Sequence, residues 1–335
     1  MRDRARPAAK TACRSISLTL IEVLLAAGIL SAIACGAGAG SSSVPESPAG
    51  QPETTARPAP PSTTTAPVQS SAPATATSTE TPPDEVEQTV RAFGRKLAKV
   101  SLLAPPETLR TSIRKEYGAL VTPDLLNRWI TDPGEAPGRL TSSPWPDHID
   151  ILRTDRNRSG ADRTLLFGDV VEVSSAGGGA PVDRVPVAIE LDHTGDGWKI
   201  SGWWSSAPRT PSGGDALGAA AVVESYYAAI GRGDYETAYH DWGNSGQASG
   251  KTLDQFRSGF ASTARTAVVT GPPGRVEGAA GSRYVGIPVE ITATTKEGET
   301  QHFRGSYTMR RTVIEGSTPA QRRWHITTAK ISRKE

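Results

Sequence analysis

The chain has 335 residues, which is enough for two ordinary domains that each bury a core. Hydrophobic residues make up only 36%, while Gly and Pro number 34 and 26, which predicts folded domains joined to a segment that cannot fold. Residues 1–14 carry five basic side chains and one acid, so the overall net charge of +2 leaves −2 for the remainder. This balance gives no indication of nucleic acid as a partner, and we expect none.

The first 35 residues predict an export signal. Basic residues up to position 14 precede an apolar run over 16–34, which ends in small side chains just before Cys35. This order is the layout of a secretory signal. Glu22 interrupts the run, which makes it marginal as a permanent membrane span. We therefore expect the bulk of the chain to be exported and anchored to the cell membrane on its extracytoplasmic face.

Cys35 adds a more specific expectation. A Cys after small residues at the end of such a run resembles the bacterial lipobox, in which that Cys is diacylated and becomes the first mature residue. Ala32 stands three residues earlier, where the motif usually has Leu. The resemblance implies that Cys35 is lipidated and that the membrane is a partner. A plain cleaved signal and an uncleaved anchor remain open as alternatives.

A second resemblance competes for the same leader. The stretch from Leu18 to Leu25 resembles the start of type IV pilins, in which a Glu placed like Glu22 pairs with the N-terminus of a neighbouring subunit. Ser17 stands where that family nearly always has Gly, and no long amphipathic helix follows. A pilin-like protein or a component of a secretion machine is therefore an alternative. Both resemblances imply that the rest of the chain is exported.

Residues 36–83 consist almost entirely of Ala, Ser, Thr, Pro and Gly. Such a segment cannot bury enough apolar surface to offset chain entropy, so it is predicted to be a disordered spacer. Cys13 and Cys35 are the only cysteines, which excludes a disulfide framework and a thiolate metal site beyond the leader. His-rich metal motifs and glycine-rich phosphate loops are also absent, so the sequence predicts no metal and no cofactor.

Residues 84–207 predict a first α+β domain. Val86, Val90 and Phe93 recur at helical spacing near its start, and its second part shows the alternation that is typical of strands. The predicted helices cover 85–103, 108–117 and 122–130, and the predicted strands cover 148–154, 163–174, 182–192 and 197–204.

A short linker over 208–214 precedes a second domain, 215–335, with the same order of elements. Val289 and Ile291 belong to a strictly alternating row that is expected to line one buried face, so the intervening Glu290 is expected to face solvent. The predicted helices cover 216–231, 234–242 and 253–264, and the predicted strands cover 267–270, 283–295, 302–313 and 323–332.

The two halves close alike, with a strand that starts near Trp198 or Trp324, which indicates a tandem duplication of architecture. The helix over 222–230 and the Gly-Asp-aromatic step over 233–239 resemble the opening of the nuclear transport factor 2-like (cystatin-like α+β cone) superfamily. Residues 136–147 of the first half are similar to segments of other exported bacterial proteins. The resemblance implies an α+β fold with two cone-shaped domains, each with helices packed on a curved antiparallel sheet. That superfamily includes enzymes, ligand pockets and assembly modules, so it does not decide the function.

A fold of this kind leaves a cavity where its helices close over the sheet. In the second domain, this implies an aromatic pocket for a small hydrophobic ligand. Alternatively, the same side chains simply fill the core, as aromatic residues at such spacing often do. The candidate pocket residues are Tyr226, Tyr239, His240, Trp242, Phe256, Tyr284, Phe303 and Tyr307.

The basic residues of 301–335 allow two interpretations. They form either a surface for acidic lipid head groups or wall polymers, or an ordinary solvated strand face. Arg310 and Arg311 are neighbours on a predicted strand, so their side chains point to opposite faces and one of them must bond inward.

His240-Asp241 is the only adjacent His–Asp pair in the chain. An isomerase-like enzyme would need an inward acid beside a Tyr, whereas Asp241 lies near a helix end and is expected to act as a structural cap. No other arrangement indicates catalysis. The leading hypothesis is a membrane-tethered binding or assembly module, without catalytic activity, for a protein partner or a small hydrophobic ligand. A small-ligand carrier or isomerase-like enzyme that uses the second-domain cavity is the alternative.

Overall fold

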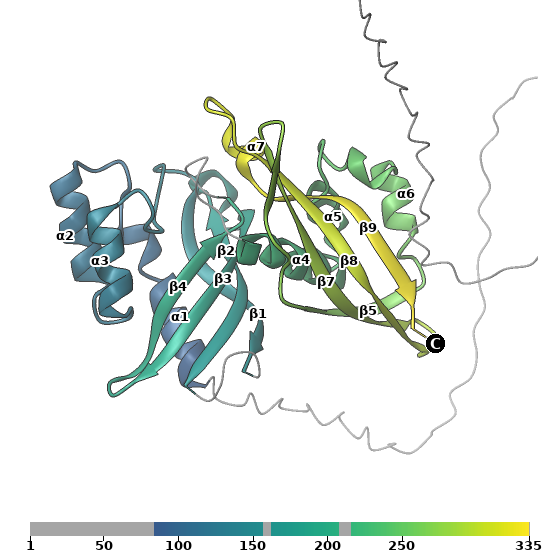
Figure 1. Ribbon diagram of the computed structural model, residues 1–335, viewed down its shortest axis with the longest axis horizontal. Helices are drawn as coiled ribbons and strands as arrows, with labels where there is room; N and C mark the ends of the chain where they lie inside the picture. Colours follow the sequence, from purple (N-terminus) through teal and green to yellow (C-terminus); the bar gives the residue numbers. More distant parts are fainter. Residues whose placement is uncertain (1–83, 157–161, 208–215, 335) are drawn as a thin grey trace, which may run out of the picture. The chain divides into compact units, whose positions relative to one another are not determined.

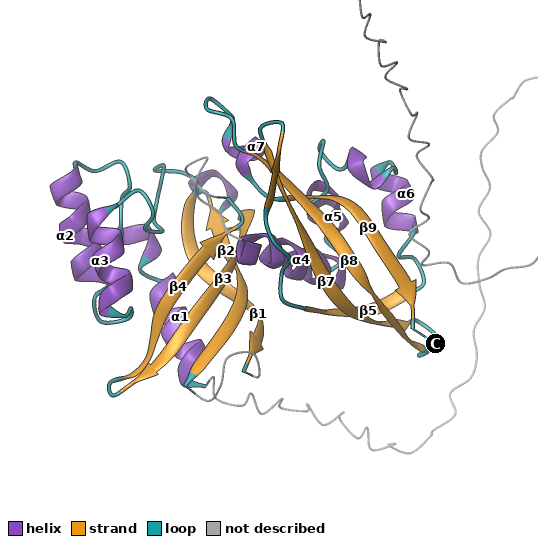
Figure 2. Ribbon diagram, in the orientation of Figure 1, coloured by secondary structure: helices purple, strands orange, loops and turns teal. Residues whose placement is uncertain are grey.

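The computed structural model describes residues 84–156, 162–207 and 216–334, so Cys35, the spacer 36–83 and the linker 208–214 lie outside the described residues. The described residues belong to one compact unit. Their fold is α+β, with two antiparallel sheets and several helices (Figures 1 and 2). No helix in the described ranges is long and apolar enough to cross a membrane.

The first half begins with helices, as predicted. Asp84 accepts a hydrogen bond from the backbone N–H of Glu87 at 3.0 Å, and Thr122 caps the third helix in the same way. The first predicted helix is shorter than expected: it ends at Gly94, where any Cβ would lie 2.9 Å from the backbone nitrogen of Ile149. The elements are α1 (Glu85–Gly94), the 3-10 helix η1 (Leu97–Lys99), α2 (Pro106–Tyr117) and α3 (Pro123–Thr131).

The first sheet is an antiparallel meander in the order β1-β2-β3-β4. Its first strand starts three residues before the predicted position, and the turn between the second and third strands uses Gly178 and Gly179 at positive φ. The strands are β1 (Trp145–Asp155), β2 (Arg163–Val173), β3 (Pro181–Thr194) and β4 (Gly197–Ser205), and the short helix η2 (Ser175–Gly177) lies between β2 and β3.

The second half repeats the order of helices followed by a sheet, here β5-β7-β8-β9 with β6 paired to β7. Asp234 caps the second helix of this half, as its sequence predicts. The elements are α4 (Ala216–Gly231), α5 (Tyr235–His240), η3 (Gln247–Ser249), α6 (Leu253–Ser258), β5 (Thr263–Thr270), β6 (Glu277–Ala279), β7 (Ser282–Thr295), β8 (Thr300–Thr312), α7 (Pro319–Arg322) and β9 (His325–Arg333).

The alternation predicted for the second sheet is confirmed. Val289 and Ile291 of β7 are buried, and Glu290 between them is exposed. The expectation for the paired arginines is also confirmed, because Arg310 is exposed whereas Arg311 is 1% exposed and lies 5.3 Å from the Trp324 ring. The second sheet therefore buries one face under its own helices and exposes the other.

The first sheet is buried on both faces. Leu166 and Val170 of β2 belong to the core under α1, α2 and α3, whereas Leu165 and Phe167 point the other way and join the core of the second half. Helix α4 covers that second face: it contacts β2, β3 and β4 of the first sheet as well as β5, β7 and β9 of the second (Figure 1). The two halves thus share a core around one helix.

Helix α4 has the composition that such a position requires. Most of its residues are buried, and small or apolar side chains surround its axis. At Gly218, an added Cβ would lie 2.6 Å from the carbonyl oxygen of Ser205, so only glycine permits this approach of α4 to β4.

Candidate binding cavity and the seam between the two halves

The structure brings six of the eight predicted pocket residues together as part of a packed core. Tyr226 is central, with the ring centroids of its aromatic neighbours between 5.0 and 6.4 Å away, and the hydroxyls of Tyr227 and Tyr307 lie 2.7 Å apart. His240 is exposed on α5, and Tyr284 is half-buried on β7. The six core members are Tyr226, Tyr239, Trp242, Phe256, Phe303 and Tyr307.

A cavity of about 570 Å³ lies in the first half, which the sequence did not indicate. It lies over the face of the first sheet that α3 covers, and α7 of the second half closes one side. Its wall is largely aliphatic and aromatic. The apolar lining residues include Leu97, Leu102, Leu125, Trp129, Val170, Val185, Val187 and Trp203.

Two features of the local sequence build this wall. Leu125 and Trp129 are four residues apart on α3, so both side chains face the sheet. Trp203 lies on the same side because a β-bulge after Ile200 shifts the alternation of β4, and its ring centroid is 5.6 Å from that of Phe93. The cavity is therefore flanked by aromatic rings from a helix and a strand, which are rigid and well packed.

The loop after α3 forms the outer wall and is tied to the core. The Tyr117 hydroxyl donates to the carbonyl of Pro137 at 2.9 Å, and the backbone N–H groups of Arg139 and Leu102 bond to Val100 and Arg139 at 2.8 and 2.9 Å. These bonds fix the loop across the cavity, so the cavity is preformed.

The rim of the cavity is polar. Arg128 and Glu135 come from α3 and the loop after it, Glu172 from the end of β2, and Arg322 and Arg323 from the end of α7. Burial raises the pKa of Glu172, and the neighbouring Asp183 raises it further, while Arg323 lowers it. Arg323 itself binds both carboxylate oxygens of Asp183, at 3.3 and 2.5 Å.

The contact between Arg323 and Asp183 is part of the interface between the two halves, which we call the seam. Next to it, the backbone N–H of Trp324 donates to the carbonyl of Ser206 at 3.0 Å. The entry to β9 is therefore fastened to the end of the first sheet. Because Arg323 also lines the cavity, the cavity and the seam share a residue.

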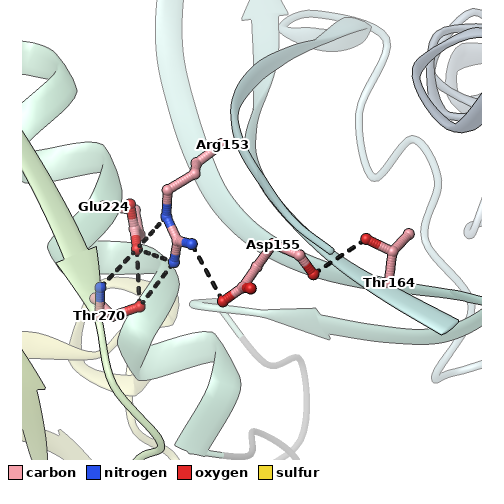
Figure 3. A network of polar contacts seen from close by, with 5 residues as sticks. All are labelled: Arg153, Asp155, Thr164, Glu224 and Thr270. Carbon is pink, nitrogen blue, oxygen red and sulfur yellow. Dashed lines mark hydrogen bonds and ion pairs between the residues drawn. The ribbon is translucent and has the colours of Figure 1, made fainter. Parts of the chain in front are cut away.

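A second part of the seam is a buried ion pair between Arg153 on β1 and Glu224 on α4 (Figure 3). Glu224 is 4% exposed, and its Oε1 accepts from Arg153 Nη2 at 2.6 Å and from the backbone and hydroxyl of Thr270 at 3.1 and 2.8 Å. Arg153 also contacts Asp155 at 3.2 Å, and the Asp155 carbonyl accepts from Thr164. Every charge in this network has a partner, which buried charges require.

Buried carboxyl groups complete the seam. Asp169 of β2 is fully buried on the α4 side of the first sheet, with Arg184 Nη1 3.9 Å from its Oδ2. Burial raises the pKa of Asp169 to about 6, although Ser225 of α4 opposes the rise. Burial also raises the pKa of Asp241, next to the end of α5, and Asp169 adds to that rise. For both acids, burial therefore outweighs the attraction of the nearby arginines.

The basic residues of 301–335 lie in different environments in the structure. Arg304 and Lys330 are exposed on the outer face of the second sheet, with Glu290 directly across from Arg304. Arg311 and Arg323 point inward, and Arg333 forms an exposed ion pair with Glu299 at 2.7 Å.

Comparison with known proteins gives little further information. No model of a known protein family matches the sequence, and no curated protein matches it. Among solved structures, the chain is similar to an "Ntf2 like protein involved in plasmid conjugation", with 10% identity and a TM-score of 0.22 over 74% of this chain and 96% of that chain. A likeness at this level does not assign a function.

Within the described residues, no group of His, Cys, Asp and Glu is arranged to bind a metal ion. The features that sequence reasoning missed are the first-half cavity and the seam. The residues that could have indicated the cavity are Trp129 and Trp203, because each is a large aromatic residue of the first half that faces inward. Glu224 carried the signal for the seam, because it is an acid within an otherwise apolar helix.

Proposed function

We propose that this protein is an exported, membrane-tethered binding protein whose first half binds a small amphipathic ligand without transforming it. The observation that carries the proposal is the cavity between α3 and the first sheet. Its volume of about 570 Å³ lies within the range of small-molecule sites, roughly 300–1,000 Å³. Its apolar wall and few polar rim groups also match the usual lining of such sites.

The sequence supports the tether. The basic leader, the apolar run and Cys35 are consistent with a lipidated N-terminus, and residues 36–83 would serve as a spacer to the folded part. The proposal includes the assignment of the two halves as tandem nuclear transport factor 2-like cones, which the order of helices and antiparallel strands in each half supports.

The cavity is tested by filling it. In the exported chain without its leader, residues 36–335, Val185→Trp places a large ring among the lining residues. We expect this variant to lose at least tenfold in affinity for a dansylated fatty acid, measured by energy transfer from tryptophan. The matched control is Val182→Trp on the same strand, whose side chain is 51% exposed. Equal binding by both variants and the parent chain would refute the cavity as the site.

A second candidate function is acid–base catalysis on a ligand in the same cavity. The observation that favours it is Glu172, a half-buried carboxyl in the lining whose pKa is raised by burial. This would make the protein isomerase-like. Glu172→Gln separates the two functions, because it would abolish turnover in an enzyme and leave the affinity of a binding protein nearly unchanged.

A further inference from the structure

The rim of the first-half cavity carries arginines, whereas its wall is largely apolar. We call Arg128 and Arg322 the arginine pair. Arg128 is exposed, its Nη2 donates to the carbonyl of Ser201 at 3.3 Å, and it forms no ion pair within the described residues. Arg322 donates to the carbonyl of Ser317, and its Nε is buried without a hydrogen-bond partner among the described residues.

The acids of the lining do not neutralise this pair. Glu135 is exposed and forms no ion pair within the described residues. The third arginine of the rim, Arg323, is already held by both oxygens of Asp183. Burial and Asp183 raise the pKa of Glu172 and Arg323 lowers it, and within the described residues Glu172 forms no ion pair with Arg128 or Arg322.

A guanidinium without a carboxylate partner at the edge of an apolar cavity is a recognition group for an anion. Arg presents a planar set of N–H donors that matches the oxygens of a carboxylate or a phosphate. In this cavity, the apolar lining would take the body of a ligand and the arginine pair its head group. Neither half supplies this arrangement alone, because Arg128 lies on α3 and Arg322 on α7.

We propose that the ligand of this cavity is an anionic amphiphile, with an aliphatic body against Trp129 and Trp203 and a carboxylate or phosphate head group at the rim that carries Arg128 and Arg322. This inference rests on the proposed binding function. It adds the chemical class of the ligand and makes the ligand a contact between the two halves.

The test uses one alkyl chain with four head groups. Dodecanoate, dodecyl phosphate, dodecanol and dodecyltrimethylammonium are titrated below their micellar concentrations into residues 36–335, with binding measured by calorimetry. We expect the two anions to bind at least tenfold more tightly than dodecanol, because hydrogen bonds to charged groups are among the stronger ones. The cation is expected to bind more weakly than dodecanol. The preferred anion identifies the head group.

Variants assign the effect to the arginine pair. Arg128→Gln and Arg322→Gln are each expected to weaken the binding of the preferred anion about tenfold and to leave the binding of dodecanol unchanged. Arg95→Gln, an exposed position outside the cavity, is the control and is expected to change neither.

The outcomes separate this inference from the proposed function. If none of the four compounds binds, the proposed function fails. If all four bind with equal affinity, or if the arginine variants bind the anions as well as the parent does, the cavity binds ligands but the anionic class is wrong. Selective binding of the anions that depends on Arg128 and Arg322 supports the proposal.

Discussion

Arg153 and Glu224 form an ion pair of 2.6 Å between residues that are 71 positions apart, with the Glu224 side chain 3% exposed. Arg153 belongs to the first sheet and Glu224 to α4, so the pair crosses the seam (Figure 3). Removing one partner of a buried pair leaves an uncompensated charge, which costs more than the pair itself contributes.

We therefore predict that Arg153→Ala lowers the free energy of unfolding by about 3 kcal/mol at neutral pH. Urea denaturation followed by circular dichroism measures the change. The comparison is Arg163→Ala, which removes an exposed pair with Asp192 at 2.7 Å and should cost less than about 1 kcal/mol. A loss of the same size in both variants would mean that the seam pair is not buried as described.

Asp169 gives a prediction about pH. Its pKa is raised by burial to about 6, above the ordinary value of 3.8 for an aspartate side chain. The unfolded chain therefore loses this proton first as pH rises, so stability falls between about pH 4 and pH 6 and the loss is complete above that range. Below pH 4 the group is protonated in both states, and its full contribution is present.

Asp169→Asn removes this titration. We expect the variant to be more stable than the parent at pH 7, by at most about 3 kcal/mol, with the difference shrinking toward pH 4. Arg184 keeps a second partner, Asp150, at 2.5 Å. The midpoint of urea unfolding across this pH range measures the effect. A difference between variant and parent that does not change with pH would contradict the assignment to Asp169.

Two glycines on α4 should respond to the same substitution with opposite signs. Alanine normally favours a helix over glycine by about 1 kcal/mol. At Gly218, however, the new Cβ would meet the Ser205 carbonyl at 2.6 Å, whereas at Gly231 its nearest neighbours, on Thr266, are 4.0 Å away. Gly218→Ala is expected to destabilise by about 1–3 kcal/mol and Gly231→Ala to stabilise slightly, as judged by thermal unfolding. If both variants are stabilised, α4 does not pack against β4 as closely as described.

The processing of the leader is decided by mass spectrometry of the mature protein. We expect a diacylglycerol on Cys35 and release of the protein from the membrane fraction in Cys35→Ser. Cleavage before Leu18 with methylation of the new N-terminus would instead select the pilin-like alternative. An unmodified N-terminus after Cys35 would indicate a plain secretory signal.

Local patterns predicted much of the fold. The α+β class, the order of elements and the burial of Val289 and Ile291 follow from periodicity, because each depends on side chains a few residues apart. That one of Arg310 and Arg311 turns inward also followed from alternation alone. The length of the first helix did not, since it ends where Gly94 packs against Ile149, a contact between distant segments.

The cavity and the seam could not be predicted, because they depend on which faces of the first sheet are covered. Periodicity shows that Val185 faces one side of its strand. It shows neither the bulge that turns Trp203 to the same side nor the space that a loop and α7 leave above them. Helix α4 did carry a usable signal. Its apolar residues surround the axis, and a helix that is apolar all round is buried on every side.

That shared helix affects whether the two halves of the chain can be separated. The two halves expected from the sequence meet just before α4, but α4 packs on both sheets. A cut between the repeats would expose Leu165 and Phe167 on one fragment and the Ala- and Val-rich side of α4 on the other. Each fragment would then aggregate or recruit a replacement for its missing neighbour, so we expect the two halves to form one indivisible module.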